Sequence, residues 1–195
     1  FTPRGRTIFR YTLAALLVLN ETSWHIWNAA NGQWTIQTML PLHLCSVLVW
    51  TSAYMLVTRS YAVYEFSYFM GIAGAFQALL TPDAGIYGFP HYRAFQTFIS
   101  HGGIFLAAIY MTLVEGYRPT WKSVGRVILW TNIYMVAVFV LNQVIGSNYL
   151  FIAHKPETPS LIDMLGPGPV YILAIEAIGV LMGALLYLPY SIKDR

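Results

Sequence analysis

Charged residues are scarce in this sequence. They make up only 10% of the 195 residues, whereas hydrophobic residues make up 57%. A soluble domain usually carries about 25% charged residues. Because so few charges cannot cover a surface in water, lipid is the expected solvent. The sequence therefore predicts an integral membrane protein.

Cysteine is almost absent as well, since Cys45 is the only one. One cysteine cannot form an internal disulfide, so no disulfide framework is expected. The basic residues are scattered rather than gathered on one face, which argues against nucleic acid as a partner. Neither a GxSxG elbow nor a glycine-rich phosphate loop is present. No ligand pair has a structural-zinc spacing, so neither a metal nor a cofactor is expected.

Long apolar runs dominate what is present. A membrane-spanning helix needs about 20 mostly apolar residues, and turn-forming stretches such as "TPDAGIYGFP" and "LGPGP" separate the runs. We predict an all-α, polytopic membrane helix bundle in which residues 1–195 form a single integral membrane domain. The six predicted spans are Thr7–Asn28, Trp34–Val57, Tyr61–Leu80, Ala94–Val114, Val124–Ile145 and Pro169–Pro189.

Lysine and arginine are distributed unevenly between the two sets of loops. The loops "TPDAGIYGFPHYR" and "NYLFIAHKPETPS" carry only Arg93 and Lys155, and most other basic residues lie on the opposite side. Basic residues in short loops favour the cytoplasmic side of a membrane. We therefore expect both ends of this chain, including the C-terminus, to be cytoplasmic and these two loops to face outward.

Polar residues interrupt the apolar runs mainly in the outer half of the predicted helices. Ionisable groups inside a membrane are costly and indicate function. Glu21 and His25 are four residues apart, so they share one helix face and are predicted to be able to pair. Cys45 is expected near mid-bilayer, and His101 about two turns into its helix. If all six helices face a common centre, these groups predict one polar cavity that opens outward.

The stretch "LPLHLCSVLVW" places His43 two residues before Cys45. Two residues correspond to about 200° around a helix, so the two side chains do not share a face. His43 is therefore expected to pack or to form hydrogen bonds, and not to act as the base for Cys45. Pro41 is expected to kink the helix above the thiol. A lone buried cysteine is ordinarily a small apolar residue, so a packing role for Cys45 stays open.

Several motifs together resemble a known family. They are "LPLHLCS", "QALLTPDAGIYGFPHYR", "FISHGG", "YRPTWKS" and "NQVIGSNYLFIAHKPETPSLIDMLGPGPVYI". This string resembles the YwaF-like family of bacterial integral membrane proteins, which is similar to the eukaryotic transmembrane protein 164 acyltransferases. The resemblance runs from about Thr7 to Pro189. It implies a bacterial cell membrane, and a further apolar helix before "RGRTIFRY" that would make seven in the full protein.

The resemblance also implies an activity. The eukaryotic members are described as acyltransferases that move a fatty acyl chain between phospholipids, using a cysteine nucleophile and a histidine on separate helices. The matching residues are Cys45 in "HLCS" and His101 in "FISHGG". Our hypothesis is a membrane-embedded acyltransferase or transacylase with a thioester at Cys45, in which the His101 imidazole generates the thiolate. Membrane phospholipids are the expected partners.

Further polar residues are candidates for binding the substrate. Asn142, Asn148 and Tyr149 are candidate donors to an oxyanion. Residues at the outer mouth are candidates for a lipid phosphate, and two carboxylates are candidates for orienting His101 or another donor. The full predicted substrate-binding set is His43, Asp83, His91, Arg93, Asn142, Asn148, Tyr149, Lys155 and Glu176.

Other functions stay open at the level of the sequence. A lipase-like hydrolase would use water in place of the acceptor. A transporter or binding protein for a small molecule or a lipid would use the outward-facing polar cavity as its ligand site, and a proline-broken helix with convergent polar groups suits that class. A structural or assembly role would explain the helices but not the buried polar residues.

Overall fold

The computed structural model describes residues 2–82, 88–156 and 161–193. Every regular element among them is helical, and they contain no strand, so the all-α prediction is confirmed. The chain divides into two compact units. The first comprises residues 1–34 and 44–119, and the second comprises residues 35–43 and 120–195. The single membrane domain stays a prediction.

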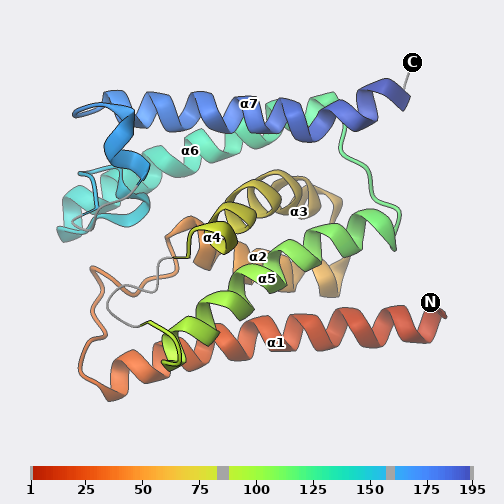
Figure 1. Ribbon diagram of the computed structural model, residues 1–195, viewed down its shortest axis with the longest axis horizontal. Helices are drawn as coiled ribbons and strands as arrows, with labels where there is room; N and C mark the ends of the chain where they lie inside the picture. The colour runs from red at the N-terminus through yellow and green to blue at the C-terminus, as the bar shows by residue number, and fades with distance from the viewer. Residues whose placement is uncertain (1, 83–87, 157–160, 194–195) are drawn as a thin grey trace. The chain divides into compact units, whose positions relative to one another are not determined.

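Among the described residues, the first unit contains six helical elements (Figure 1). They are α1 (Pro3–Ala30), α2 (Leu44–Thr58), α3 (Tyr61–Phe66), η1 (Ser67–Ala75), α4 (Phe76–Leu80) and α5 (Tyr92–Leu113). The predicted span Tyr61–Leu80 corresponds to α3, η1 and α4 in succession, of which η1 is a π-helix. A π-helix is wider than an α-helix and is often found at functional sites.

Three of the described helices are long and apolar enough to cross a membrane. They are Tyr92–Leu113, Trp121–Ile145 and Val170–Ile192. The apolar helix α2 is shorter, and α1 has sufficient length but is too polar to meet the same criterion. Association with a membrane is therefore supported by these three helices, whereas the sequence predicted six spans.

The second helix begins later than the sequence predicted. We expected a span from Trp34, but residues 35–43 form turns and bends, and α2 starts at Leu44. Pro41 therefore precedes the helix and does not kink it. Proline disfavours helical conformation in the residue before it and lacks an N–H group, which explains the late start. As a result, Cys45 lies in the first turn of α2 and not in the middle of a helix.

Helices α2 and α5 both run antiparallel to α1. Arg10 near the start of α1 bonds to the carbonyl of Leu56 near the end of α2. Ser23 late in α1 contacts the hydroxyl of Tyr92 at the start of α5. Gly103 lets α5 approach α1 closely, because a Cβ there would lie 2.7 Å from Leu17 Cδ2. It follows that α2 and α5 run parallel to each other.

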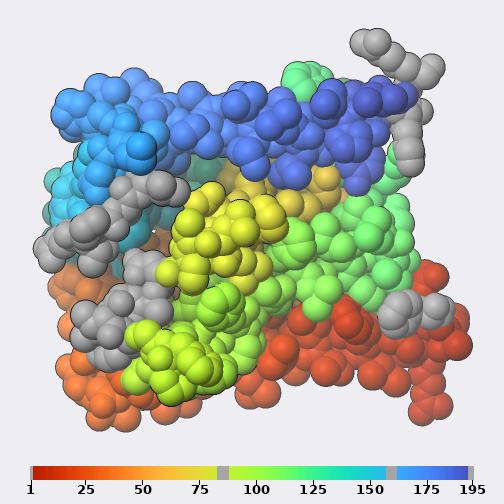
Figure 2. All heavy atoms as spheres, viewed as in Figure 1, coloured from red at the N-terminus to blue at the C-terminus, as the bar shows by residue number. Residues whose placement is uncertain are grey.

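The second unit is built on α6 (Trp121–Ile145) and α7 (Val170–Lys193), which pack together. Short 3-10 helices, η2 (Tyr149–Phe151) and η3 (Leu161–Leu165), lie between them in the chain. A capping box of Thr120 and Ser123 starts α6, and Gly146 ends it with φ 67°. Figure 2 shows side chains of α7, coloured blue, along the helix on the viewed face. Its exposed side chains are largely apolar, as expected for contact with lipid.

Candidate functional site

Cys45 and His101 both lie on the buried faces of their helices. Cys45 is half-buried. The residues three, four and seven positions further along α2 are fully buried: Leu48, Val49 and Ser52. His101 is also half-buried, and Ile104, on the same face of α5, is completely buried. Residues at these spacings share one helix face. Both side chains therefore point into the packed interior of the first unit.

The two residues also lie at the same level of the unit. A Cβ placed on Gly71 of η1 would lie 3.1 Å from Ile104 Cγ2 of α5 and 4.0 Å from Leu48 Cδ2 of α2. Cys45 precedes Leu48 by three residues, and His101 precedes Ile104 by three residues. Because α2 and α5 run parallel, both side chains lie about one turn before this shared contact.

The ring of His101 is held in one tautomer. Its Nδ1 atom is 2.8 Å from the carbonyl oxygen of Thr97, one turn earlier on α5. A carbonyl oxygen only accepts hydrogen bonds, so Nδ1 carries the proton and donates. In a neutral imidazole, Nε2 is then unprotonated and accepts. This is the tautomer that a general base requires.

Two opposite charges act on this pair. Glu21 of α1 and Arg93 of α5 both interact electrostatically with Cys45, and Arg93 also interacts with His101. The guanidinium of Arg93 lies 4.1 Å from the ring centroid of Trp24 and donates to Gln96 Oε1. These contacts hold its positive charge near the thiol and the imidazole.

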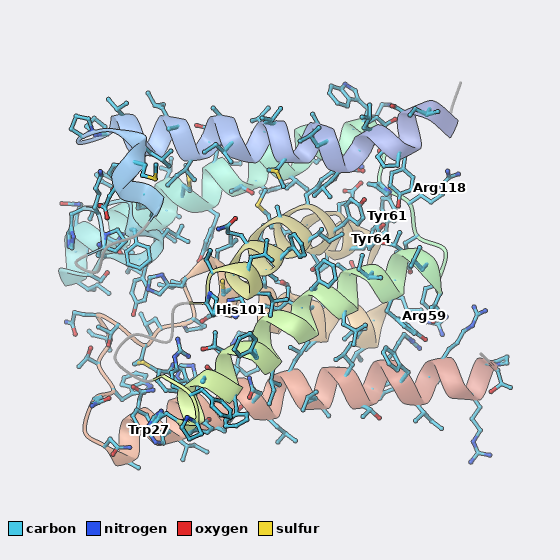
Figure 3. All side chains as sticks on the ribbon, in the orientation of Figure 1. Trp27, Arg59, Tyr61, Tyr64, His101 and Arg118 are labelled. Atoms are coloured by element: carbon cyan, nitrogen blue, oxygen red, sulfur yellow. The ribbon has the colours of Figure 1, made fainter. Side chains whose placement is uncertain are left out.

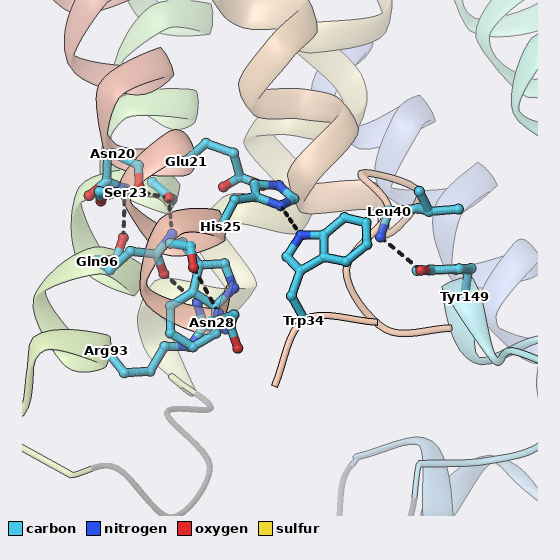
Figure 4. Close-up of polar contacts among 12 residues, drawn as sticks. Asn20, Glu21, Ser23, His25, Asn28, Trp34, Leu40, Arg93, Gln96 and Tyr149 are labelled. Atoms are coloured by element: carbon cyan, nitrogen blue, oxygen red, sulfur yellow. Dashed lines mark hydrogen bonds and ion pairs between the residues drawn. The ribbon is translucent and has the colours of Figure 1, made fainter. Parts of the chain in front are cut away.

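The predicted pair of Glu21 and His25 is present. His25 Nε2 lies 3.9 Å from Glu21 Oε1, and Glu21 is only 4% exposed. His25 Nδ1 accepts a hydrogen bond of 3.1 Å from Trp34 Nε1 (Figure 4). The Glu21 carboxylate is therefore fixed on the buried face of α1.

A polar network joins α1 to α5 (Figure 4), and the sequence did not predict it. Asn20 Nδ2 donates to the backbone carbonyl of Gln96 at 3.0 Å and to Ser100 Oγ at 2.7 Å. Gln96 Nε2 also donates to Ser100 Oγ, at 3.2 Å. The signal in the sequence was the spacing of Gln96 and Ser100, four residues apart and next to His101. The network connects Arg93, through Gln96, to the turn that carries His101.

The three candidate oxyanion donors all belong to the second unit and lie around the turn after α6. Asn142 Oδ1 accepts from Ser147 Oγ at 2.7 Å and from the Tyr149 amide at 2.9 Å, and its Nδ2 donates to the Tyr149 carbonyl at 2.9 Å. Asn148 Nδ2 donates to the His154 carbonyl at 2.8 Å. Tyr149 is completely buried. The Asn142 and Asn148 side chains thus hold this turn, whereas the Tyr149 hydroxyl donates to the Ile36 carbonyl at 2.7 Å and accepts from the Leu40 amide at 2.8 Å.

His43 packs and forms hydrogen bonds in the second unit. Its ring centroid lies 5.2 Å from that of Tyr149 and 5.1 Å from that of Phe151. Its Nδ1 accepts from the Leu150 amide at 3.4 Å. Leu150 and Phe151 both have positive φ angles, of 61° and 54°. These contacts agree with the scaffold role expected for His43.

The other predicted site residues are spread over both units. His91 Nδ1 accepts from the Arg93 amide at 3.1 Å and caps α5. Lys155 Nζ lies 4.0 Å from Asp163 Oδ1, and Glu176 Oε1 accepts from Asn132 at 2.8 Å. Asp83 lies outside the described residues. Within the described ranges, no group of three or more His, Cys, Asp or Glu side chains is placed to hold a metal ion.

Comparison with known proteins gives one match. A family model described as the TMEM164 family matches residues 1–187. No curated protein and no solved structure matches the chain.

Proposed function

The chain belongs to the TMEM164 family, and from this premise we propose that it is a membrane-embedded acyltransferase that acts on phospholipid acyl chains. Cys45 is the nucleophile and His101 is the base. The observation that carries the proposal is the placement of the two side chains on buried faces of parallel helices, one turn before their common contact with η1. The fixed tautomer of His101 supports the same assignment.

The proposed reaction has two halves. His101 Nε2 takes the thiol proton, and the Cys45 sulfur attacks the carbonyl carbon of a phospholipid ester. The carbon–sulfur bond forms, the ester carbon–oxygen bond breaks, and the lysophospholipid leaves with the proton from the imidazolium. In the second half, the hydroxyl of an acceptor lipid gives its proton to His101 and attacks the thioester. The acyl chain moves to the acceptor, and the thiol is restored.

The position of Cys45 in the first turn of α2 favours this chemistry. The first four N–H groups of a helix have no partner within the helix. Together with the helix dipole, they favour negative charge on a nearby thiolate or oxyanion. An apolar environment disfavours the thiolate, so this help and the His101 base are both needed. The amides at the start of α2 are therefore proposed oxyanion donors.

We propose that Arg93 and His91 contact the phosphate of the substrate. Arg93 is the cation that acts on both reacting groups, and guanidinium matches phosphate geometry. The aromatic residues beside it, Trp24 and Trp27, are of the type found at the membrane interface. The remaining residues that we propose to bind the substrate are those inferred from the sequence, namely His43, Asp83, Lys155 and Glu176.

We further propose the six-span arrangement in a bacterial cell membrane, with a cytoplasmic C-terminus. The six apolar runs of the sequence and the distribution of lysine and arginine support this arrangement, and the three long apolar helices support its location in a membrane. Because Cys45 is the only cysteine, a Cys45→Ser background allows single cysteines to be introduced at will. A cysteine at Lys122 should react with a membrane-impermeant maleimide only in inverted vesicles, and one at Lys155 only in intact cells.

The acyl-enzyme provides the direct test of function. Purified protein is incubated with phosphatidylcholine or phosphatidylethanolamine vesicles, and its intact mass is measured before and after hydroxylamine treatment. We expect a fatty acyl adduct that hydroxylamine removes and that Cys45→Ala lacks. Ser46→Ala, which changes the neighbouring residue of the same turn, is the matched control and should keep the adduct. Full acyl transfer by Cys45→Ala would refute the proposal.

A transporter or lipid-binding function is the second candidate. The turns at residues 35–43 before α2 and the buried network of Asn20, Gln96 and Ser100 favour it, since transporters use broken helices and polar groups inside the membrane. In that case Cys45 is a packing residue. Uptake that is unaffected by Cys45→Ala but abolished by Asn20→Leu would support the transporter against the enzyme.

A further inference from the structure

A second cluster of charged residues lies far from Cys45 within the first unit. Glu115, just after α5, has a side chain only 8% exposed and pairs with two arginines. Its Oε1 lies 3.7 Å from Arg10 Nε, and its Oε2 lies 3.8 Å from Arg59 Nε. We call Arg6, Arg10, Arg59 and Arg118 the arginine cluster. They come from α1, from the α2–α3 connection and from the segment after α5.

The arginine cluster and Arg93 lie at opposite ends of the first unit. Figure 3 shows Arg59 and Arg118 at one end, Trp27 at the other, and His101 between them. Arg93 lies in the first turn of α5, and Glu115 follows the end of this helix. At 1.5 Å per residue, the length of α5 corresponds to about 30 Å. The hydrocarbon core of a bilayer has a similar thickness. The arginine cluster and Arg93 are therefore spaced to face the headgroups of opposite leaflets.

The arginine cluster is fixed by the fold. Arg10 is only 3% exposed, and its Nη1 donates to the Leu56 carbonyl at 2.7 Å. Arg59 has φ 57°, a conformation rare outside glycine, and its carbonyl accepts from the Tyr117 hydroxyl. The Arg118 carbonyl accepts from the Tyr61 hydroxyl at 2.7 Å. Tyrosine hydroxyls thus hold the backbone at both Arg59 and Arg118.

Positive charge exceeds negative charge at this end of the unit. Glu115 is shared by two guanidinium groups, and the Tyr110 hydroxyl interacts electrostatically with Arg6, Arg10 and Glu115. Two further acids lie on the neighbouring helices: Glu21 of α1 acts on Cys45, away from the cluster, and Glu65 of α3 is buried. Four arginines against two carboxylates leave a surplus of positive charge that an anion would balance.

We propose that the arginine cluster binds a phosphate group, supplied by an anionic phospholipid in the leaflet opposite to Arg93 or by a soluble phosphate ester. Arg59 is the contacting residue, because its side chain is 50% exposed while its Nε is held by Glu115. Guanidinium groups bind phosphate with paired hydrogen bonds. Tyr61 and Tyr117, whose rings lie 6.0 Å apart, flank the cluster as tyrosines do at headgroup level. This site does not depend on acyl transfer at Cys45.

General attraction of basic loops to a membrane is the simpler explanation, and it makes a different prediction. Arginines near an anionic surface attract lipid in proportion to their charge, wherever they lie. Arg4 is exposed at the start of α1, near Arg6, whereas the ion pairs of Glu115 described above are formed with Arg10 and Arg59. If the attraction is general, Arg4→Gln and Arg59→Gln should weaken the binding of anionic lipid equally. If the cluster forms a specific site, Arg59→Gln should weaken this binding and Arg4→Gln should not.

Native mass spectrometry of the purified protein measures the binding. Dioleoylphosphatidylglycerol and dioleoylphosphatidylcholine are titrated separately into the wild type, Arg59→Gln, Arg118→Gln and Arg4→Gln. We expect the wild type to prefer phosphatidylglycerol, Arg59→Gln to bind it about tenfold more weakly, and Arg4→Gln to stay within about twofold. Millimolar glycerol 3-phosphate is the second arm. Displacement of the lipid identifies a soluble phosphate ester as the ligand, and retention of the lipid identifies the headgroup.

The controls separate this site from the active site and from misfolding. Each variant must keep the wild-type melting temperature, and Arg118→Gln, at an exposed side chain, replaces Arg59→Gln if the latter unfolds. The titration is repeated in Cys45→Ala, where acyl transfer is absent and phosphatidylglycerol binding should persist. Equal binding of the two lipids by the wild type, or equal effects of Arg4→Gln and Arg59→Gln, would overturn the proposal.

Discussion

The imidazole of His101 donates from Nδ1 to the carbonyl oxygen of Thr97, 2.8 Å away. This bond leaves Nε2 as the atom that receives a proton. Replacing His101 with Asn keeps a group at the position of Nδ1 but removes the base. We expect the rate of acyl-enzyme formation to fall about 10²- to 10⁴-fold, the usual contribution of a general base. Intact-mass time courses provide the measurement.

Thr97 supplies a matched control for that variant. Its backbone carbonyl holds His101, whereas its Oγ1 is buried and has no hydrogen-bond partner among the residues that the structure describes. Thr97→Val removes the unpaired hydroxyl and leaves the carbonyl in place. Since a buried unpaired polar group costs about 1–3 kcal/mol, we expect unchanged acyl transfer and equal or greater stability. A large loss of activity in Thr97→Val would show that the hydroxyl, and not the carbonyl, serves His101.

Two substitutions at Arg93 should distinguish its effect on substrate binding from its effect on the chemical step. Its guanidinium contacts both the Trp24 ring and Gln96. Arg93→Lys keeps the charge but loses the planar, paired hydrogen bonds to phosphate, so we expect KM to rise more than kcat falls. Arg93→Gln removes the charge that acts on Cys45 and His101 and should lower both kcat and kcat/KM. Identical kinetics in the two variants would contradict this division.

The neighbouring glycines Gly102 and Gly103 should respond differently to the same substitution. A Cβ at Gly103 would lie 2.7 Å from Leu17 Cδ2, whereas nothing lies within 4 Å of one at Gly102. Gly103→Ala forces α1 and α5 apart or moves Leu17, and we expect a loss of about 1–3 kcal/mol. Gly102→Ala should be neutral or slightly stabilising. Thermal unfolding in detergent compares the two. Because Leu17→Ala removes the side chain that the new Cβ meets, the loss in Gly103→Ala combined with Leu17→Ala should be smaller than the sum of the two single losses.

The carboxyl group of Glu176 accepts from Asn132 Nδ2 across α6 and α7. Glu176→Gln keeps a carbonyl acceptor in the same place and should be tolerated. Glu176→Leu removes the acceptor, and we expect a loss of about 1 kcal/mol, typical of polar contacts between membrane helices. If Glu176 also contacts substrate, Glu176→Gln will reduce acyl transfer while the melting temperature stays unchanged.

The sequence predicted much of the helical framework because periodicity, apolar length and turn residues act locally. The predicted spans Ala94–Val114 and Val124–Ile145 differ from α5 and α6 by only a few residues. The pairing of Glu21 and His25 also followed from their spacing alone. The predicted start of the second span was wrong. Its apolar run continues through residues 35–43, but these residues, which include Pro41, form turns and bends instead of a helix.

By itself, then, the sequence determined an all-helical chain with long apolar segments, since these properties depend on neighbours along the chain. Only the tertiary structure decided which distant residues meet. It set Cys45 and His101 at one level, because glycines in η1 and α5 allow close helix packing. It also gathered Arg10, Arg59 and Glu115 from separate segments. Contacts between helices depend on packing in three dimensions, and no local pattern specifies them.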